Sequence, residues 1–528
     1  MLLNVSDLWD ETQPAFDICI VGAGAAGITL ALELIGTQLK VCVLESGGLS
    51  YDNRAQELAR GKNVGHPYYS LDESRDRWLG GTTNSWSGEC RPLDDLDFQK
   101  RSWVPNSGWP IDRRTLDPDY EKAQEICQLG PTLYEDETLA RNKGAITLHE
   151  SDSNTFRTSF FQYSPPTRFG IDYRRDLETA DNLFLFTQAT TLQVNTDDCA
   201  KKAISVSVAR PDGATTTVMA RYFVLAAGGL EVPRILLNSR NTQASGLGNT
   251  YGHLGRYFME HLFVDDVLGF VDRIPAGKFR LLSRRFQWQG ARLRGAITPS
   301  PDFLTRAKLP NFCFRIATLS SRSPAIGSLA ILVENVTKGR YPPRAASHVR
   351  SALRDWRAIA DFGWRRVSHK ISGHIGPEAL FCHLVAEQVP HPESLVSLSL
   401  DRDRFGQNCI ELDWQLSKDD RKHIDKACAA LVSAFDQAGY QLFFRQKAAE
   451  NGCAGSLIRG GRHHMGTARM SDCAKNGVVD QTGRLHGVEN LFVAGSAVFP
   501  TGGYANPTLT IVALAVRLAR HLKDGIRI

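Results

Sequence analysis

This 528-residue sequence lacks the features that mark several common protein classes. Its 11 cysteines are odd in number and never occur as C-x-x-C, which argues against a secreted disulfide framework and against a zinc ribbon. No stretch of about 20 apolar residues occurs, so no segment is expected to span a membrane. Residues 1–17 have no basic start and no long apolar run. The sequence therefore predicts a cytoplasmic protein without a signal peptide.

The charge of the chain is also nearly balanced. It has 62 Lys and Arg against 57 Asp and Glu, a net charge of +5, and no run of basic residues dominates. A nucleic-acid partner is therefore not expected. The hydrophobic share of 42% and the charged share of 23% are typical of a globular protein. The length is too great for one compact core and predicts two or three domains.

A dinucleotide-binding fingerprint lies near the N-terminus. Residues 16–21 (FDICIV) have the pattern of a short buried strand, and residues 22–27 (GAGAAG) follow at once as G-x-G-x-x-G. Residues 28–34 have the pattern of a helix, and residues 41–44 that of a second apolar strand. This strand leads into Glu45, about 20 residues after the glycines, where an acidic side chain accepts from a ribose hydroxyl.

The residues of the glycine turn have separate expected tasks. Gly22 permits the tight turn, Gly24 lets a pyrophosphate approach the backbone, and Gly27 lets the helix pack close to the strand. Ala25 and Ala26 lie at the helix N-terminus, which offers free N–H groups and a positive dipole end to phosphates. No second G-x-G-x-x-G occurs, which favours FAD as the single resident cofactor.

Two further segments have the pattern of strand, turn and helix. Residues 221–229 (RYFVLAAGG) form an apolar strand that ends in a glycine turn, and a helix is expected to start at Pro233. Near the C-terminus, residues 491–495 (LFVAG) have the pattern of a strand. An apolar helix is expected over about 507–522, with Asn506 suited to cap it.

Taken together, these segments resemble the glucose–methanol–choline (GMC) oxidoreductases, which are flavoenzymes. The resemblance covers nearly the whole chain and is closest to the pyranose-oxidase-like branch. The motifs that carry it are residues 22–27 with Glu45, residues 80–84 (GGTTN), residues 227–229 (AGG) with Pro233, residues 463–467 (HHMGT), and Asn506 with Pro507.

The resemblance implies an α/β fold with two parts. One is a Rossmann-type FAD-binding domain assembled from separated segments, and the other is an α+β substrate domain with an antiparallel sheet over the flavin. The expected FAD domain covers 1–275, with an inserted cover segment at about 61–180. Residues 276–454 form the expected substrate domain, and residues 455–528 return to the FAD domain and carry the active site.

Two adjacent histidines, His463 and His464, stand in the strongest of these motifs. A shared metal ion is not expected, because neighbouring side chains point to opposite faces of a strand and diverge by about 100° in a helix. Two plain structural histidines remain an alternative. The resemblance makes His463 the catalytic base, which accepts the proton of a substrate hydroxyl while hydride leaves the same carbon for flavin N5. His464 is then a neighbour that shapes the site.

The resemblance gives Asn506 the second position of the active site, where it hydrogen-bonds the substrate oxygen beside His463. The alternative is that Asn506 serves only as a helix cap. The positive end of the helix that begins at Pro507 is expected to stabilise the reduced flavin. Beyond the fingerprint, the motifs predict cofactor contacts from Gly81, Thr82, Thr83, Asn84, Ala227, Gly495, Ser496, Asn506, Pro507 and Thr508.

At two positions the sequence departs from its relatives. Some pyranose-oxidase-like enzymes hold FAD covalently through a histidine in the segment that matches residues 80–92, and Ser85 stands near that place. Non-covalent FAD is therefore expected. Gly495 stands where many family members have an acidic residue, so an acidic contact to the cofactor is either missing or supplied elsewhere.

The sequence thus predicts an FAD-dependent oxidoreductase that oxidises an alcohol or sugar-type hydroxyl of a small molecule to a carbonyl. Oxygen or another molecule takes the electrons, and no motif separates an oxidase from a dehydrogenase. Two alternatives remain at this point. The same fold could serve a non-oxidative lyase-type or specialised-metabolite reaction, or it could bind flavin without turnover. Reduction of the flavin by a substrate separates these alternatives from the main prediction.

Overall fold

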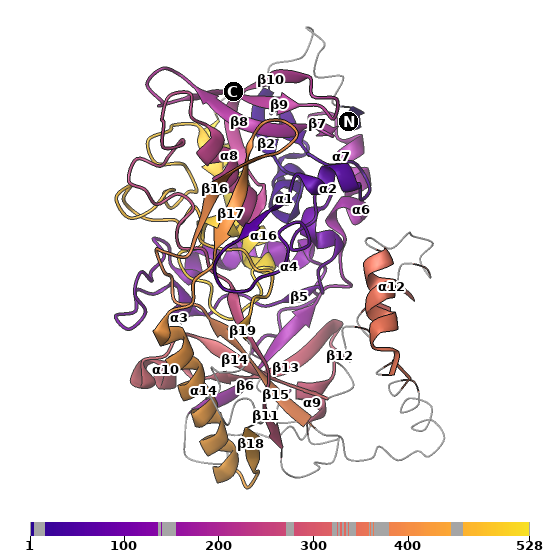
Figure 1. The fold of residues 1–528 in the computed structure, drawn as a ribbon, viewed down its shortest axis with the longest axis vertical. Helices are drawn as coiled ribbons and strands as arrows, with labels where there is room; N and C mark the ends of the chain where they lie inside the picture. The colour runs from indigo at the N-terminus through magenta and orange to yellow at the C-terminus, as the bar shows by residue number, and fades with distance from the viewer. Residues whose placement is uncertain are drawn as a thin grey trace.

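The fold consists of two large sheets, drawn one above the other in Figure 1, and a small third sheet. None of the helices in the described part of the chain has the length and apolar composition needed to cross a membrane. The computed structural model describes residues 2–4, 16–135, 155–270, 279–318, 345–357, 380–444 and 458–526, with scattered positions at 139, between 325 and 336, at 359–360 and at 363.

The first sheet is mostly parallel. Its eight strands are β1 (Leu2–Asn4), β2 (Phe16–Val21), β3 (Val41–Leu44), β7 (Leu183–Thr187), β8 (Thr190–Thr196), β9 (Ala203–Ala209), β10 (Thr215–Leu225) and β20 (Leu491–Val493). Their order is β1-β7-β3-β2-β10-β9-β8, and β20 pairs with β10 in parallel. Only β8 and β9 run antiparallel to their neighbours. The central strands are buried on both faces, as a parallel sheet covered by helices requires.

The second sheet is antiparallel at every described pairing. Its order is β18-β11-β15-β14-β13-β6-β5, with β12 beside β13 and β19 beside β11. The strands are β5 (Glu89–Cys90), β6 (Phe156–Tyr163), β11 (His261–Phe270), β12 (Phe286–Trp288), β13 (Ala291–Pro299), β14 (Phe312–Thr318), β15 (Leu380–Glu387), β18 (Leu442–Phe444) and β19 (Ile458–Arg459).

These two sheets confirm the predicted fold class, a Rossmann-type α/β part and a part with an antiparallel sheet. The third sheet joins β4 (Gly61–Asn63), β17 (Asn408–Asp413) and β16 (Leu395–Arg402). Strands β5, β6 and β11 of the second sheet come from the chain before residue 275. The domain boundaries at 275 and 454 stay a prediction.

Helices cover the first sheet and fill the space beside both sheets. Helix α1 (Ala25–Leu34) packs against α16 (Thr508–Gly525), and α16 packs against α4 (Asp117–Ile126). Helix α8 (Gly228–Asn238) lies against β8 and β16. The other helices of the described residues are α2 (Asn53–Glu57), α3 (Asp95–Phe98), α6 (Phe169–Asp172), α7 (Arg174–Thr179), α9 (Arg280–Ser283), α10 (Pro301–Ala307), α12 (Ala345–Arg354) and α14 (Lys418–Gln437), with 3-10 turns η2 (Gly81–Asn84), η3 (Arg113–Leu116) and η7 (Ser496–Val498).

The predicted start of α8 at Pro233 is wrong, because the helix begins at Gly228 and contains Pro233. Proline has no N–H to donate to the carbonyl four residues earlier, which here belongs to Gly229. The hydroxyl of Thr467 donates to that carbonyl over 2.6 Å. A residue far away in sequence therefore supplies the hydrogen bond that the proline removes from the helix.

The contact between Thr467 and Gly229 makes a prediction about stability. Thr467→Val keeps the side-chain shape but leaves the buried Gly229 carbonyl without its donor, so the unfolding free energy should fall by about 1–3 kcal/mol. Thr467→Ser keeps a hydroxyl and serves as the matched control. In a Pro233→Ala background, whose new N–H can reach the same carbonyl, Thr467→Val should cost less. Urea unfolding of wild type and of these four variants measures the costs, and an equal cost of Thr467→Val in both backgrounds contradicts this account.

Candidate active site

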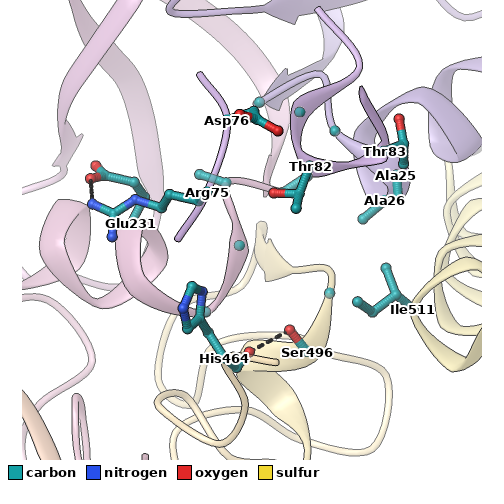
Figure 2. A pocket seen from close by; sticks show the side chains of 18 of the residues that line it. Ala25, Ala26, Arg75, Asp76, Thr82, Thr83, Glu231, His464, Ser496 and Ile511 are labelled. Carbon is teal, nitrogen blue, oxygen red and sulfur yellow. Dashed lines mark hydrogen bonds and ion pairs between the residues drawn. The ribbon is translucent and has the colours of Figure 1, made fainter. Parts of the chain in front are cut away.

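A cavity of about 400 Å³ lies where four parallel strands of the first sheet end. The chain lines it directly after the carboxyl ends of β2, β3, β10 and β20. Open α/β sheets bind their ligands in such a crevice. Figure 2 shows Ala25, Ala26 and Ile511 on one side of this space and His464 on the other, where the guanidinium of Arg75 turns toward Glu231.

The glycines of the fingerprint differ in what surrounds them. Gly22 has a φ of +98°, which suits glycine in a tight turn. A Cβ on Gly27 would lie 1.9 Å from the carbonyl oxygen of Gly22, so Gly27 lets α1 pack against the turn. A Cβ on Gly24 would meet only the Cα of Gly81, at 4.0 Å. Protein packing therefore does not explain Gly24, and the open space beside it leaves room for the expected close approach of a ligand.

The carboxylate of Glu45 closes one side of this turn. Its Oε2 accepts from the backbone N–H of Ala23 at 2.9 Å, and its Oε1 accepts from that of Gly47 at 2.8 Å. Burial raises the pKa of Glu45 and outweighs these hydrogen bonds, which lower it. Each carboxylate oxygen can accept a second hydrogen bond, so Glu45 can still receive a ligand hydroxyl.

Of the residues predicted to contact a cofactor, Gly27 and Asn84 do not line the cavity. Asn84 turns inward, and its amide donates to the carbonyl of Leu79 at 2.9 Å. The predicted residues that do line it, including the proposed base, are Gly22, Gly24, Ala25, Ala26, Glu45, Gly81, Thr82, Thr83, Ala227, His463, Gly495, Ser496, Asn506, Pro507 and Thr508.

The two adjacent histidines lie on residues 458–470, a segment that crosses from the second sheet to the first. It begins with β19, which pairs with β11, and Met465 then forms a bridge with Met259. Further along, the N–H of Gly466 donates to the carbonyl of Ser496 at 3.1 Å, beside the end of β20. The histidines therefore stand between the strand ends of the first sheet and the antiparallel sheet.

The ring of His464 faces the cavity wall near Arg75 (Figure 2). Its carbonyl accepts from the hydroxyl of Ser496 at 2.6 Å, while its buried Nε2 has no hydrogen-bond partner within the described part of the chain. Burial, and then the positive charges of Arg75 and Arg462, lower the pKa of His464 to about 3. The ring is therefore neutral near pH 7.

Glu260 holds the backbone of His463. The N–H of His463 donates to both carboxylate oxygens, at 2.9 and 3.0 Å, and the N–H of Gly461 donates to Oε2 at 2.8 Å. The hydroxyl of Tyr68 also donates to this carboxylate. Burial raises the pKa of Glu260 to about 7, although these donors lower it.

The ring of His463 meets that of His261, the first residue of β11. The two Nδ1 atoms lie 2.8 Å apart, and the ring planes are inclined by 80°. Burial, followed by His261, lowers the pKa of His463 well below its usual range. His463 is thus neutral near pH 7. It lines the cavity, and its Nε2 hydrogen-bonds to no described residue.

The structure corrects one alternative for Asn506. The N-cap of α16 is Pro507, and no side chain caps this helix. The Oδ1 of Asn506 instead accepts from the guanidinium of Arg315 at 3.4 Å, and Arg315 forms an ion pair with Glu89 at 3.0 Å. An arginine only donates, so the atom that faces it is the oxygen. The amide N–H groups of Asn506 remain available to the cavity.

Sequence reasoning missed Glu260, His261 and Arg315, which position the two predicted catalytic residues. A weak signal existed for each of them. Arg315 is the single charged residue of the apolar strand β14, and Glu260 with His261 heads the largely apolar strand β11. For the metal alternative, the described residues contain no group of three or more His, Cys, Asp or Glu placed to hold an ion.

Comparison with known proteins gives a consistent result. A family model described as GMC oxidoreductase matches residues 390–515. The chain is 24% identical to 2-methyl-1,2-propanediol dehydrogenase of Mycolicibacterium austroafricanum, covering 96% of this chain and 95% of the relative. It is 25% identical to paromamine 6'-oxidase of Streptomyces fradiae, covering 97% and 93%. A fungal aryl-alcohol oxidase structure, 15% identical, shares the fold with a TM-score of 0.58 over 97% of this chain and 99% of that one.

The surroundings of Gly24 make a prediction about cofactor binding. Gly24→Ala should leave the flavin-free fold intact, because φ −88° and ψ −162° suit alanine and the new Cβ meets no atom nearer than 4.0 Å. FAD affinity should fall at least about tenfold, or 1.4 kcal/mol, because the methyl group takes the space of the ligand. Flavin titration and thermal unfolding measure the two effects.

Two other glycines serve as controls for this experiment. Gly525→Ala, in the last residue of α16, should leave FAD affinity unchanged and should not lower the thermal stability, because no atom outside its own stretch of the helix lies within 4 Å of the new Cβ. Gly27→Ala should prevent folding, because its Cβ would lie 1.9 Å from a backbone oxygen. A Gly24→Ala protein that binds FAD as tightly as wild type contradicts the assignment of this turn.

Proposed function

This chain belongs to the GMC oxidoreductase family, and we propose that it oxidises a hydroxyl group of a small alcohol or sugar-type molecule to a carbonyl. The observation that carries the proposal is the pairing of His463 and Asn506 on one cavity. A neutral ring nitrogen and a free amide donor line the same space. Two relatives that match over most of their length are named as 2-methyl-1,2-propanediol dehydrogenase and as paromamine 6'-oxidase, which supports this reaction class.

FAD is the cofactor that the cavity fits. Gly24 leaves room for close approach, and Ala25 and Ala26 line the cavity at the start of α1, where backbone N–H groups have no partner inside the helix. Two buried polar atoms of the wall, Oγ1 of Thr191 and Nε2 of His464, lack partners within the described residues. When bound, FAD supplies the acceptor for the hydride that leaves the carbinol carbon.

His463 is the proposed general base. It removes the hydroxyl proton of the substrate at Nε2, the ring nitrogen that no described residue engages. The lowered pKa keeps this nitrogen unprotonated near pH 7. A base in this state is ready before the substrate arrives, and no proton has to leave the site first.

Asn506 is the proposed partner of the base. Because Arg315 occupies its Oδ1, the amide offers N–H donors to the substrate oxygen and holds the hydroxyl beside His463. Pro507 and Thr508 line the cavity at the start of α16. The positive end of this 18-residue helix stabilises negative charge that develops in the cavity.

Either oxygen or another molecule is the proposed electron acceptor, because the named relatives include a dehydrogenase and an oxidase. Neither relative is named for a lyase-type reaction, so nothing favours that alternative over oxidation. The experiment below distinguishes the proposed oxidation from the alternative of a protein that binds flavin without turnover.

The thiols support the proposal of a cytoplasmic location. All ten cysteines in the described ranges are free. Burial raises the pKa values of Cys42 and Cys90, with the neighbouring thiols of Cys19 and Cys127 adding to the shift. Neighbouring thiols that are not joined in a disulfide are typical of a reducing compartment.

Anaerobic mixing with a panel of sugars, glycosides and alcohols tests the proposed reaction. At least one hydroxyl compound should bleach the visible absorbance of the bound flavin in the wild type. His463→Ala should keep its flavin but be reduced about 10²–10⁴-fold more slowly, because that is the usual contribution of a general base. His521→Ala, on the exposed surface of α16, is the control and should match wild type. Bleaching of His463→Ala at the wild-type rate, or a panel that never bleaches the wild type, contradicts the proposal.

We also propose that FAD is held without a covalent bond. Ser85, at the position where some relatives of the pyranose-oxidase-like branch have a linking histidine, lies in the cavity lining and donates its hydroxyl to Asp76. Acid precipitation of the yellow protein should therefore leave all the flavin colour in the supernatant. Flavin absorbance that stays with the washed precipitate rules out this mode of binding.

A further inference from the structure

His261 lies directly behind the proposed base, between two groups that it contacts with both ring nitrogens. Its Nδ1 is 2.8 Å from Nδ1 of His463, and its Nε2 is 3.1 Å from the carbonyl oxygen of Gly502. The side chain is fully buried. In the neighbouring strand β15, the residue opposite His261 is Glu387, and both of its carboxylate oxygens are bound by Arg101 at 2.7 Å.

The carbonyl of Gly502 decides where His261 carries its proton. A carbonyl oxygen only accepts, so Nε2 of His261 must be the donor in this contact. Burial lowers the pKa of His261 to about 4, so the ring is neutral near pH 7 and has a single N–H group. That group is at Nε2, and Nδ1 of His261 therefore carries a lone pair.

The proton between the two rings must then belong to His463. Two nitrogens 2.8 Å apart need one proton between them, and His261 has none to give at Nδ1. His463 is also neutral, so its single proton lies on Nδ1 and its Nε2 carries the lone pair. The other assignments leave two lone pairs facing each other, or a lone pair of His261 facing the Gly502 carbonyl.

We propose that His261 is a positioning residue that holds His463 with its proton on Nδ1, so that Nε2 presents an acceptor to the substrate hydroxyl. The inference rests on the proposed role of His463 as the base. A His463 with its proton on Nε2 would offer a donor at the cavity, beside the donor that Asn506 already offers, and the hydroxyl proton would have no acceptor. A hydrogen-bonded partner at one ring nitrogen of a catalytic imidazole fixes the orientation of the ring and decides which nitrogen carries the proton.

Two substitutions separate this role from packing. His261→Phe fills the space but cannot accept the proton of His463, so kcat for flavin reduction should fall about 10–100-fold, part of the full contribution of the base. His261→Asn places an amide oxygen close to the former Nδ1 and should stay within about 3-fold of wild type, since it still accepts from His463. KM and flavin content should be unchanged in both. Equal activity of the Phe variant and wild type, or equal loss in both variants, overturns the proposal.

Nitrogen-15 NMR of the histidine-labelled holoenzyme tests the tautomer without turnover. The imidazole signals that vanish in His463→Ala belong to His463, and they should show a protonated Nδ1 and an unprotonated Nε2 in the wild type. A proton on Nε2 overturns the inference even if activity is high. If no hydroxyl compound reduces the flavin, the proposed function is wrong. The NMR signals still show which tautomer His463 adopts. If the Phe variant does not fold, the wild-type spectrum alone gives the answer.

Discussion

The carboxylate of Glu260 makes the interaction on which the rest of the site depends. It is buried and accepts from backbone N–H groups of Gly461 and His463, about two hundred residues further along the chain. A buried carboxylate is costly unless it is hydrogen-bonded, and burial still raises its pKa to about 7. The next residue, His261, contacts the ring whose backbone Glu260 holds. Glu260 and His261, at one corner of the second sheet, therefore fix the position of the proposed base and the ring nitrogen that carries its proton.

The site forms where the two sheets meet. The first sheet provides four strand ends and the turn around Gly24, which together make a cradle for a dinucleotide. The second sheet provides His261 from β11 and Arg315 from β14, which act on His463 and Asn506. The segment 458–470 joins the two parts, and the hydroxyl of Thr467 ties it to α8 through the carbonyl that Pro233 leaves free. The proposed cofactor cradle thus comes from the first sheet, the residues that contact His463 and Asn506 come from the second, and segment 458–470 connects the two.

The parts of the structure that depend on neighbours in sequence could be predicted. The strand, glycine turn and helix at residues 16–34 follow from a local pattern, and the fold class follows from the motifs of the family. Contacts between distant segments could not be read in the same way. Pro233 indicated a helix start because its missing N–H is best tolerated there, but Thr467 satisfies the freed carbonyl. Asn506 fits a cap by its residue type, but Arg315 takes its oxygen. Nothing in the spacing of His261 and His463 indicates that their rings meet.

The most direct test of the account is the anaerobic, single-turnover reduction of the bound flavin by an alcohol from the panel, compared with the same alcohol carrying deuterium on its carbinol carbon. The account predicts a loss of the visible flavin absorbance that is slower with the deuterated compound, because the bond from that carbon to hydrogen breaks as the flavin is reduced. Bleaching that is insensitive to the deuterium, or a flavin that no hydroxyl compound reduces, would contradict the central claim.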